Sequence, residues 1–326
     1  MSSLSGRGGP DAPSGPGGPT GTDAPAGLVA PGTAQPFLRS IAVTPLGRDE
    51  SSARFWAQPQ YVPWPKAYGG DTVAQALAAA TATVDPGRSI HSFHSYFLRP
   101  VDIGKPVTYT VQLTRDGRGF STRTVVGAQS GKEVFSGIVS FAVPAGIDVF
   151  AEPVGRAVRP AAELPSTEEF LAREGRLSGA AAEYWAWGRS FDIRHDPGPV
   201  YFDAESGREP RQALWIRAFS PIPTDPVTQQ LALAYVCDYT ILEPLLRAHG
   251  LGWQSEGVTT ASLDHSMWFH RPVDPNQWVL YVQDAVSAQG GRGLARGRFY
   301  TEGGVLVASV AQEGVIRAPG FTSAAP

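Results

Sequence analysis

Two kinds of pattern alternate along this chain: apolar stretches of helical length, and runs in which apolar and polar residues alternate. One apolar stretch covers residues 73–84, and a second begins at Val227. The alternating runs around them predict strands, because successive side chains of a strand point to opposite faces of a sheet. The predicted strands are 53–56, 92–98, 107–113, 121–128 and 134–143, and then 214–219, 263–271, 278–286, 293–300 and 305–316.

The ends of the two helices carry recognisable residues. Asp71, after two glycines, is the predicted N-cap of the first helix. Asp225 is the predicted N-cap of the second, with Pro226 at the first helical position, where proline is tolerated. Pro244 should kink or end that helix, and Gly250 is a natural stop. Two consecutive helices are therefore a possible arrangement in this half.

The chain repeats itself once. The segment FHSYFLRPV at 93–101 recurs as HSMWFHRPV at 265–273, with Phe, Arg, Pro and Val in register at an offset of 172 residues. Two further matches follow in the same order at nearly the same offset, GRGF against GRGL and VFS against LVA. Self-similarity at a fixed offset indicates a duplicated structural unit. We predict copies at 37–145 and 210–318, joined by a bridging segment at 146–209.

One helix followed by antiparallel strands predicts an α+β unit, in which a curved antiparallel sheet wraps around a central helix. Each unit alone would leave a sheet edge open, and two copies can pair side by side to cover those edges. The bridging segment contains a helical stretch at 167–174 and the aromatic string YWAW at 184–187. These aromatic residues are expected to pack over the seam between the copies, with a lid over a ligand as the alternative.

Composition narrows the classes of protein. Residues 1–36 hold 16 Gly and Pro and predict a disordered tail, and 319–326 form a short C-terminal tail. The net charge of −3 argues against nucleic acid or an anionic membrane as a partner. No apolar run approaches the roughly 20 residues that cross a bilayer. The single cysteine, Cys237, excludes an intramolecular disulfide, and a cytoplasmic location is expected.

Several kinds of chemistry have no signature here. The chain lacks the G-x-S-x-G string of common serine hydrolases and every Gly-rich phosphate-binding pattern. Its six histidines show no spacing of metal ligands, so neither a metal nor a cofactor is expected. Cys237 lies in an apolar run and is expected to be an inert buried thiol.

Three polar residues stand out in the second half. Asp238 follows the apolar run of the second helix, where a carboxylate needs polar partners unless the helix reaches solvent there or Asp238 caps a following helix. Ser262 precedes a predicted strand, and Gln312 follows an apolar strand segment. An acid, a hydroxyl and an amide that converge can hold one water, with the acid accepting its proton.

The sequence resembles the acyl-CoA thioesterase II (TesB-like) family, which has a double hot-dog fold. The resemblance covers about 40–318 and rests on Gly69-Gly70 with QAL at 75–77, HSYFLRP at 94–100, RDGR at 115–118 with STR at 121–123, LDHSMWFHRP at 263–272 and QEG at 312–314. It implies that an acyl-CoA substrate is hydrolysed to a free acid and CoA. The family's catalytic Asp, Ser or Thr, and Gln fall on Asp238, Ser262 and Gln312. Where the family usually reads Gly-Gly-Gln, this chain has Asp71 in place of Gln.

We expect direct attack by water, with the thioester oxygen stabilised by backbone N–H groups of the Gly69–Gly70 turn. Four arginines could contact the CoA phosphates: Arg99, Arg123, Arg271 and Arg292. A homo-oligomer is also expected. Two rival hypotheses remain open: a hot-dog hydratase or dehydratase using a carboxylate with His265 or His270, and an acyl-thioester binding module without catalysis.

Overall fold

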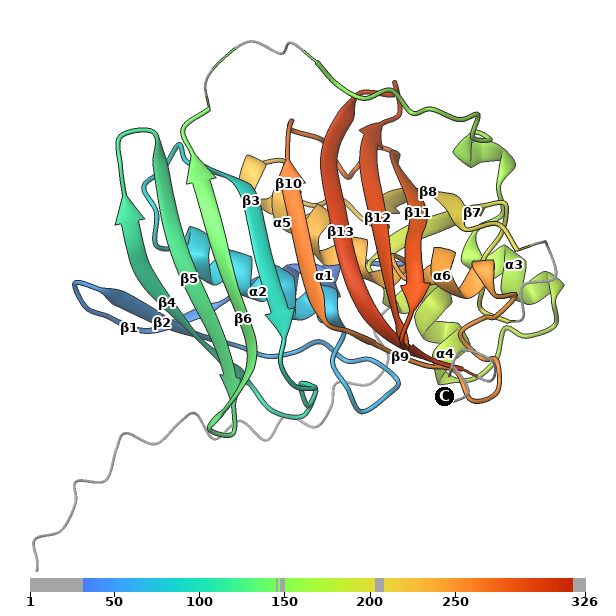
Figure 1. Cartoon of the computed structure of the whole chain (residues 1–326), viewed down its shortest axis with the longest axis horizontal. Helices are drawn as coiled ribbons and strands as arrows, with labels where there is room; N and C mark the ends of the chain where they lie inside the picture. Colours follow the sequence, from blue (N-terminus) through green and yellow to red (C-terminus); the bar gives the residue numbers. More distant parts are fainter. Residues whose placement is uncertain (1–31, 145, 147–149, 203–207, 319–326) are drawn as a thin grey trace, which may run out of the picture.

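The computed structural model describes residues 32–144, 146, 150–202 and 208–318. Most of the predicted N-terminal tail and all of the predicted C-terminal tail lie outside these residues. Within them, thirteen strands form one antiparallel sheet in the order β1-β2-β4-β5-β6-β3-β10-β13-β12-β11-β8-β7, with β9 paired to β13 (Figure 1). The first six strands come from the first half of the chain and the others from the second half. The sheet therefore runs without a break through both copies.

The strands predicted from alternation are present, with ends shifted by a few residues. In the first half the elements are α1 (Gln35–Ser40), β1 (Thr44–Arg48), β2 (Ser52–Ala57), α2 (Gly69–Thr81), β3 (Ser89–Phe97), β4 (Val107–Asp116), β5 (Phe120–Gln129) and β6 (Lys132–Ala142). In the second half they are β7 (Phe191–Asp196), β8 (Arg211–Ala218), α5 (Pro226–Val236), the 3₁₀ turn η3 (Cys237–Tyr239), α6 (Glu243–Ala248), β9 (Thr259–Ser262), β10 (Asp264–Phe269), β11 (Val279–Gln289), β12 (Arg292–Thr301) and β13 (Leu306–Arg317). The sequence reasoning missed α1, β1, β7 and β9.

The two halves meet where β3 pairs with β10. In this ladder His94 is the Cα partner of Ser266, its own counterpart 172 residues later, and His94 Nδ1 lies 3.0 Å from Ser266 Oγ. A pair formed by a residue and its counterpart marks the centre of an approximate two-fold relation between the copies. The 172-residue offset in the sequence therefore corresponds to an approximate two-fold axis in the fold. At this axis one edge strand of each half-sheet pairs with the other.

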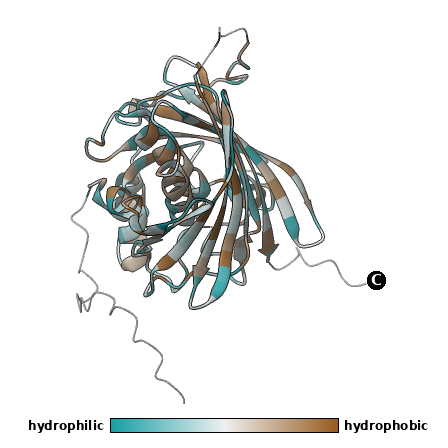
Figure 2. Cartoon of the chain, turned by 90° about the vertical axis from the view of Figure 1, so that its left-hand side faces the viewer, coloured by the Kyte–Doolittle hydropathy of each residue, from teal (hydrophilic) through white to brown (hydrophobic). Residues whose placement is uncertain are grey.

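The curved sheet wraps around α2 and α5, which lie side by side on its inner face (Figures 1 and 2). Both helices are apolar over most of their surface, and α2 is buried from Gly70 to Ala80. A helix that is apolar on all sides is stable only when it is enclosed. The core of the molecule therefore lies between these helices and the sheet.

The start of α2 differs from the prediction. Asp71 is the third residue of this helix, not its N-cap, which is Tyr68 without a side-chain cap bond. Asp71 is fully buried and accepts a hydrogen bond from the backbone N–H of Gln60 at 2.9 Å. Burial raises the pKa of its carboxyl from 3.8 to about 6, although the nearby Ser40 hydroxyl and the hydrogen bond from the Gln60 N–H oppose the shift.

The second helical region follows the sequence reasoning more closely. Asp225 caps α5 by accepting from the backbone N–H of Thr228 at 2.9 Å, and Pro226 is the first helical residue. The region divides into α5 and α6, joined by η3. Pro244 does not end a helix; it lies in the first turn of α6, where its missing N–H has no helical partner to lose.

The bridging segment contains a 3₁₀ turn (Ala161–Glu163), α3 (Thr167–Arg173), α4 (Ala180–Glu183) and a π-helical turn (Tyr184–Gly188), and it ends in β7, which pairs with β8. Tyr184 is buried and contacts both halves of the chain. Its ring meets Trp64 edge to face at 5.2 Å, and its hydroxyl lies 3.2 Å from that of Tyr239. These contacts place Tyr184 between the two halves, whereas Trp185 stacks on Tyr201 within the bridging segment, with ring centres 4.5 Å apart.

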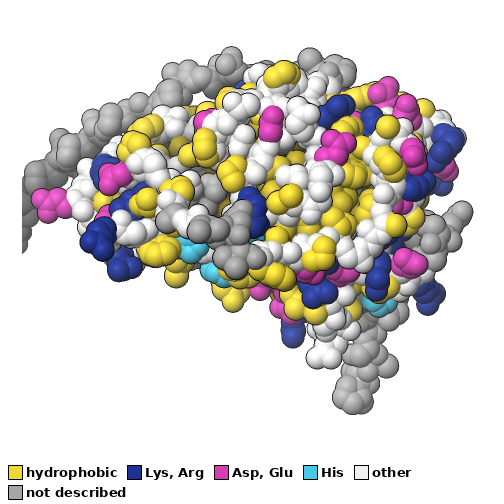
Figure 3. All heavy atoms as spheres, turned by 90° about the horizontal axis from the view of Figure 1, so that it is seen from above, with side chains coloured by type: hydrophobic (Ala, Val, Ile, Leu, Met, Phe, Trp, Pro, Cys, Tyr) yellow, Lys and Arg dark blue, Asp and Glu magenta, His cyan; other side chains and the backbone are white. Residues whose placement is uncertain are grey.

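Seen from above, the surface is not dominated by charges of one sign (Figure 3). Acidic and basic side chains are interspersed there, and neither sign forms a continuous patch (Figure 3). No helix in the described parts of the chain is long and apolar enough to cross a membrane.

Candidate active site

Asp238 lies in η3, directly after α5, and faces the first turn of α2. Its Oδ2 accepts a hydrogen bond from the backbone N–H of Gly70 at 3.0 Å. The first N–H groups of a helix lack partners within the helix and carry partial positive charge, so they stabilise a carboxylate placed there. A residue of the second half thus caps the central helix of the first.

The two glycines that open α2 are required by this close approach. A Cβ on Gly69 would lie 2.5 Å from Asp238 Oδ2, and a Cβ on Gly70 would overlap the backbone carbonyl oxygen of Tyr235. Neither has a positive φ. The glycines are therefore needed for space and not for an unusual backbone conformation.

Ser262 and Gln312 come from neighbouring strands and meet the same carboxylate. The Gln312 amide donates from Nε2 to Asp238 Oδ1 at 2.7 Å and to Ser262 Oγ at 2.8 Å. Ser262 Oγ in turn lies 3.2 Å from Asp238 Oδ1. The short strand β9 makes this possible because it pairs with β13 beside Gln312. The structure thus brings the three predicted residues into mutual contact.

The three side chains of this cluster differ in burial. Gln312 is fully buried, whereas Asp238 and Ser262 are half-buried. Tyr68 and Tyr239 stack on each other with ring centres 3.9 Å apart next to the carboxylate. Burial raises the pKa of the Tyr68 phenol, and the nearby Tyr239 and Asp238 raise it further, so this ring is neutral.

Two residues that the sequence analysis considered only in other roles, His265 and Cys237, continue this cluster. His265 is fully buried, and its Nδ1 contacts Gln312 Oε1 while its Nε2 lies 3.2 Å from Cys237 Sγ. The alternation of this strand in the sequence could have shown that His265 points inward. Residues two apart on a strand share a face, and His265, Met267 and Phe269 all face the core.

Cys237 is fully buried, and its Sγ also lies 3.1 Å from the backbone carbonyl of Ala234. Burial raises the pKa of its thiol well above the ordinary value, and the neighbouring Asp238 adds to the shift. The thiol is therefore protonated at neutral pH and is not a nucleophile.

The duplication predicts a related arrangement in the first half, and the residues there cannot form it. The positions 172 residues before Ser262 and His265 hold Ile90 and Phe93. Gln312 lies opposite His265, and the residue paired with Phe93 in the first half is the buried Val139, which has no amide. The duplicated fold therefore carries this acid–hydroxyl–amide cluster in one copy only.

The residues expected to bind substrate have other partners in the structure. The Gly70 N–H is bonded to Asp238. Arg292 pairs with Glu313 at 3.2 Å in an exposed position, and Arg271 donates to the backbone carbonyl of Leu306 at 3.1 Å. Arg99 donates to the carbonyl of Glu133 at 2.6 Å.

The suggestion that Arg123 contacts CoA phosphates is contradicted by its burial. Its side chain is 1% exposed and donates to Thr83, Asp116 and the backbone carbonyl of Arg115. It points inward because it shares a strand face with the buried Val125. Arg123 therefore ties the end of α2 to the β4–β5 turn.

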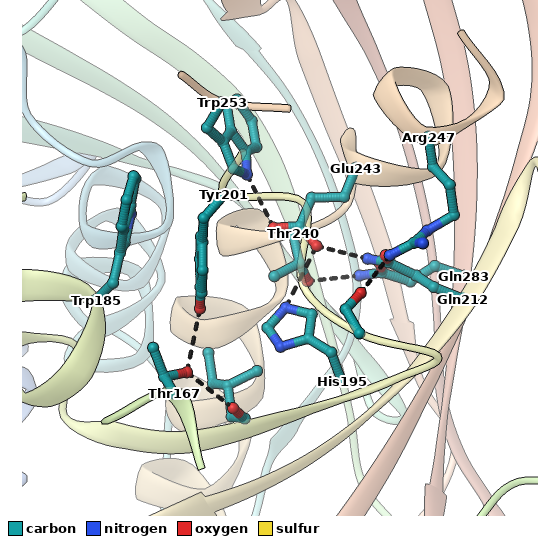
Figure 4. A network of polar contacts seen from close by, with 12 residues as sticks. Thr167, Trp185, His195, Tyr201, Gln212, Thr240, Glu243, Arg247, Trp253 and Gln283 are labelled. Carbon is teal, nitrogen blue, oxygen red and sulfur yellow. Dashed lines mark hydrogen bonds and ion pairs between the residues drawn. The ribbon is translucent and has the colours of Figure 1, made fainter. Parts of the chain in front are cut away.

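A second polar network lies in the second half (Figure 4). Glu243 is fully buried and accepts from Gln212 Nε2 at 2.7 Å and Trp253 Nε1 at 2.9 Å, with His195 Nε2 at 3.4 Å. Burial opposes ionisation of Glu243, yet His195, Trp253 and Gln212 together hold the pKa of its carboxyl below the usual value.

Glu243, Gln212 and His195 are all buried, so we assign this second network a structural role. Gln283, also in the network, donates to Thr240 Oγ1 at 2.7 Å, two residues after Asp238. Through this bond Gln283 holds the backbone segment that carries Asp238. No group of three or more His, Cys, Asp or Glu among the described residues could hold a metal ion.

Comparisons with known proteins agree with this fold. An acyl-CoA thioesterase family model matches residues 190–315, and a model of the acyl-CoA thioesterase N-terminal domain matches 60–142. The chain is 33% identical to acyl-CoA thioesterase 2 of Haemophilus influenzae over 270 residues, 81% of this chain and 92% of the relative.

Among solved structures, acyl-CoA thioesterase II TesB2 from Mycobacterium marinum superposes with a TM-score of 0.68 at 31% identity, over 89% of this chain and 99% of that one. A hot-dog protein from Alicyclobacillus acidocaldarius superposes with a TM-score of 0.69 at 19% identity, over 87% and 98% of the two chains, which supports the fold alone. The protein is a thioester hydrolase with a double hot-dog fold. The chain belongs to the acyl-CoA thioesterase family.

Proposed function

We propose that this protein hydrolyses acyl-CoA by direct attack of a water molecule that Asp238 and Ser262 bind and that Gln312 helps to position by fixing these two side chains. The observation that carries the proposal is the mutual contact of these side chains at the start of α2, with the carboxylate half-buried. The carboxylate and the hydroxyl can accept protons of a water from two directions, which fixes its lone pair toward a substrate.

The reaction follows from the roles of these groups. The water oxygen bonds to the thioester carbonyl carbon while Asp238 takes the water proton. The carbon–sulfur bond then breaks, and the CoA thiolate leaves and takes up a proton. The products are a free acid and CoA, and no acyl-enzyme forms.

The N-terminus of α2 stabilises two anions in turn, the Asp238 carboxylate and the oxyanion of the substrate. The Gly70 N–H binds the Asp238 carboxylate before the reaction. Once Asp238 has taken the proton, its need for this N–H falls, at the stage when the substrate oxygen becomes negative. The partial positive charge of the helix N-terminus, at Gly69 and Gly70, then stabilises the oxyanion.

Arg271 and Arg292 are the proposed contacts of the CoA phosphates. If Arg292→Gln or Arg271→Gln removes such a contact, KM rises for acyl-CoA and stays unchanged for the same acyl group on N-acetylcysteamine, which has no phosphates. An equal change in both KM values would exclude phosphate recognition.

The substrate class is tested by thiol release from short, medium, long and aromatic CoA esters. Hydrolysis of at least one class at catalytic rates supports the proposal. Loss of an enoyl chromophore without thiol release would support the hydratase, and tight binding with no turnover of any ester would support the binding module. His265, an acid–base candidate in the hydratase hypothesis, is fully buried behind Gln312.

A homo-oligomer remains a proposal, favoured by apolar side chains on the outer face of the sheet. Tyr96, Ile138 and Trp268 are 61%, 52% and 37% exposed on neighbouring strands β3, β6 and β10 at the seam. Light scattering after size exclusion tests it: a monomeric mass at micromolar concentration would contradict it. The cytoplasmic location is likewise a prediction, which cell fractionation would test.

A further inference from the structure

The orientation of the Gln312 amide is dictated by its neighbours. Asp238 Oδ1 lies 2.7 Å from the amide nitrogen, and a carboxylate oxygen can only accept. Turning the amide over would place its carbonyl oxygen against the carboxylate, a repulsive contact. The two N–H groups of Gln312 therefore point to Asp238 and Ser262, and its carbonyl oxygen points away from the site, toward His265.

That orientation determines the tautomer of His265. Gln312 Oε1 is an acceptor, so the facing Nδ1 must carry a proton. Burial lowers the pKa of the imidazole, although Asp238 and Gln312 oppose the shift, and the ring is neutral at neutral pH. The other nitrogen, Nε2, is then an acceptor, and the protonated thiol of Cys237 lies 3.2 Å from it.

We propose that His265 is a positioning residue for the hydrolysis: its Nδ1–H holds Gln312 in the one orientation that allows donation to both Asp238 and Ser262. The thiol of Cys237, the chain neighbour of Asp238, lies 3.2 Å from His265 Nε2 and so links the imidazole back to the residue beside the acid. Phe93 from the first half stacks on the imidazole with ring centres 5.4 Å apart. This inference rests on the proposed water attack, because His265 acts only through the amide that fixes Asp238 and Ser262, the two side chains that bind the water.

Two substitutions at position 265 separate hydrogen bonding from packing. Asparagine is smaller than histidine and leaves a gap, but its Nδ2–H can take the place of the imidazole Nδ1–H. Leucine fills the volume and has no donor. If His265 positions Gln312, His265→Asn keeps kcat within about threefold of wild type, and His265→Leu lowers kcat about tenfold with KM unchanged, the factor that one hydrogen bond is worth.

If His265 only fills space, the order of the two kcat values is reversed, because the larger apolar residue packs better. Melting temperatures are measured alongside, and His270→Leu serves as the control. His270 is an exposed histidine near the end of the same strand, bonded to Ser309 at 2.9 Å, and its removal should leave kcat unchanged.

A double-mutant cycle tests the route through Gln312. Once Gln312→Ala has removed the amide, His265→Leu should lower kcat by less than about twofold, because nothing remains for His265 to orient. A further tenfold loss in the Gln312→Ala background would show that His265 acts by another route and would overturn the proposal.

The ring itself can be observed by a long-range ¹H–¹⁵N spectrum of the wild-type protein. The proposal expects His265 with a protonated Nδ1 and an unprotonated Nε2, and the opposite tautomer would refute it. This measurement needs no turnover. An enzyme inactive on every CoA ester would therefore end the proposed function, while the tautomer would still decide the hydrogen-bond chain.

Discussion

The buried carboxyl of Asp71 offers a test of the fold that does not depend on activity. Its pKa rises from 3.8 to about 6 because it is fully buried, and its Oδ1 has no hydrogen-bond partner among the described residues. A carboxyl with a raised folded-state pKa binds its proton more tightly in the folded protein. Stability is therefore lost as pH rises from about 4 to about 6, where the folded protein is forced to release that proton.

The magnitude follows from the shift. About two pKa units at 1.36 kcal/mol each correspond to about 3 kcal/mol, as an upper value. Asp71→Asn removes the ionisation and keeps the shape, and its Nδ2 can donate toward Ser40. We expect the variant to match wild type near pH 4 and to be more stable by up to about 3 kcal/mol at pH 7.5.

Urea unfolding followed by tryptophan fluorescence at several pH values measures the difference. Asp49→Asn is the matched control with the opposite sign. Asp49 is exposed, and hydrogen bonds from Ser51 and Ser52 lower the pKa of its carboxyl to about 2, so its loss should destabilise the protein at neutral pH. A difference between Asp71→Asn and wild type that stays constant from pH 4 to pH 7.5 would refute the reasoning.

Three further predictions concern packing and reactivity. Gly70→Ala forces a Cβ against the carbonyl oxygen of Tyr235, so it should cost about 2 kcal/mol of stability and lower kcat. Gly47→Ala is the control, because a Cβ there has nothing within 4 Å, and it should change neither quantity. Unfolding and thiol-release assays compare the two variants. Arg123→Met should cost about 2 kcal/mol or more through lost buried hydrogen bonds, and a KM that rises with it would restore a role in CoA binding. Cys237 should resist a thiol reagent at pH 8 in the folded protein and react after denaturation; rapid labelling of the folded protein would contradict its burial.

The larger features of this fold could be predicted from sequence because they are repeated. The 172-residue offset, the two helices and ten of the strands each leave a pattern in the sequence, whereas the choice of β3 and β10 as the strands that pair at the seam leaves none. The edge strands β1 and β7 and the four-residue β9 are short, and β1 is exposed throughout. Such strands show too little alternation to be recognised.

The candidate site was predicted in part. An acid after an apolar helix is conspicuous, so Asp238 could be found, and Ser262 and Gln312 followed from their places beside strands and from the family resemblance. That Asp238 binds the start of α2 depends on how two helices pack across the seam, which no local pattern encodes. Asp71 was misassigned for a similar reason: residue type favours a cap, but packing of the chain around α2 buries it.

The most direct test of the water-attack account is kcat for Asp238→Asn, with the melting temperature measured on the same samples. Removing a general base should lower kcat by about 10²–10³-fold, while the melting temperature shifts by only a few degrees, since asparagine keeps the shape of the side chain and its oxygen can still accept from the donors on one side of the site. Turnover within about threefold of wild type in a folded Asp238→Asn variant would contradict the account.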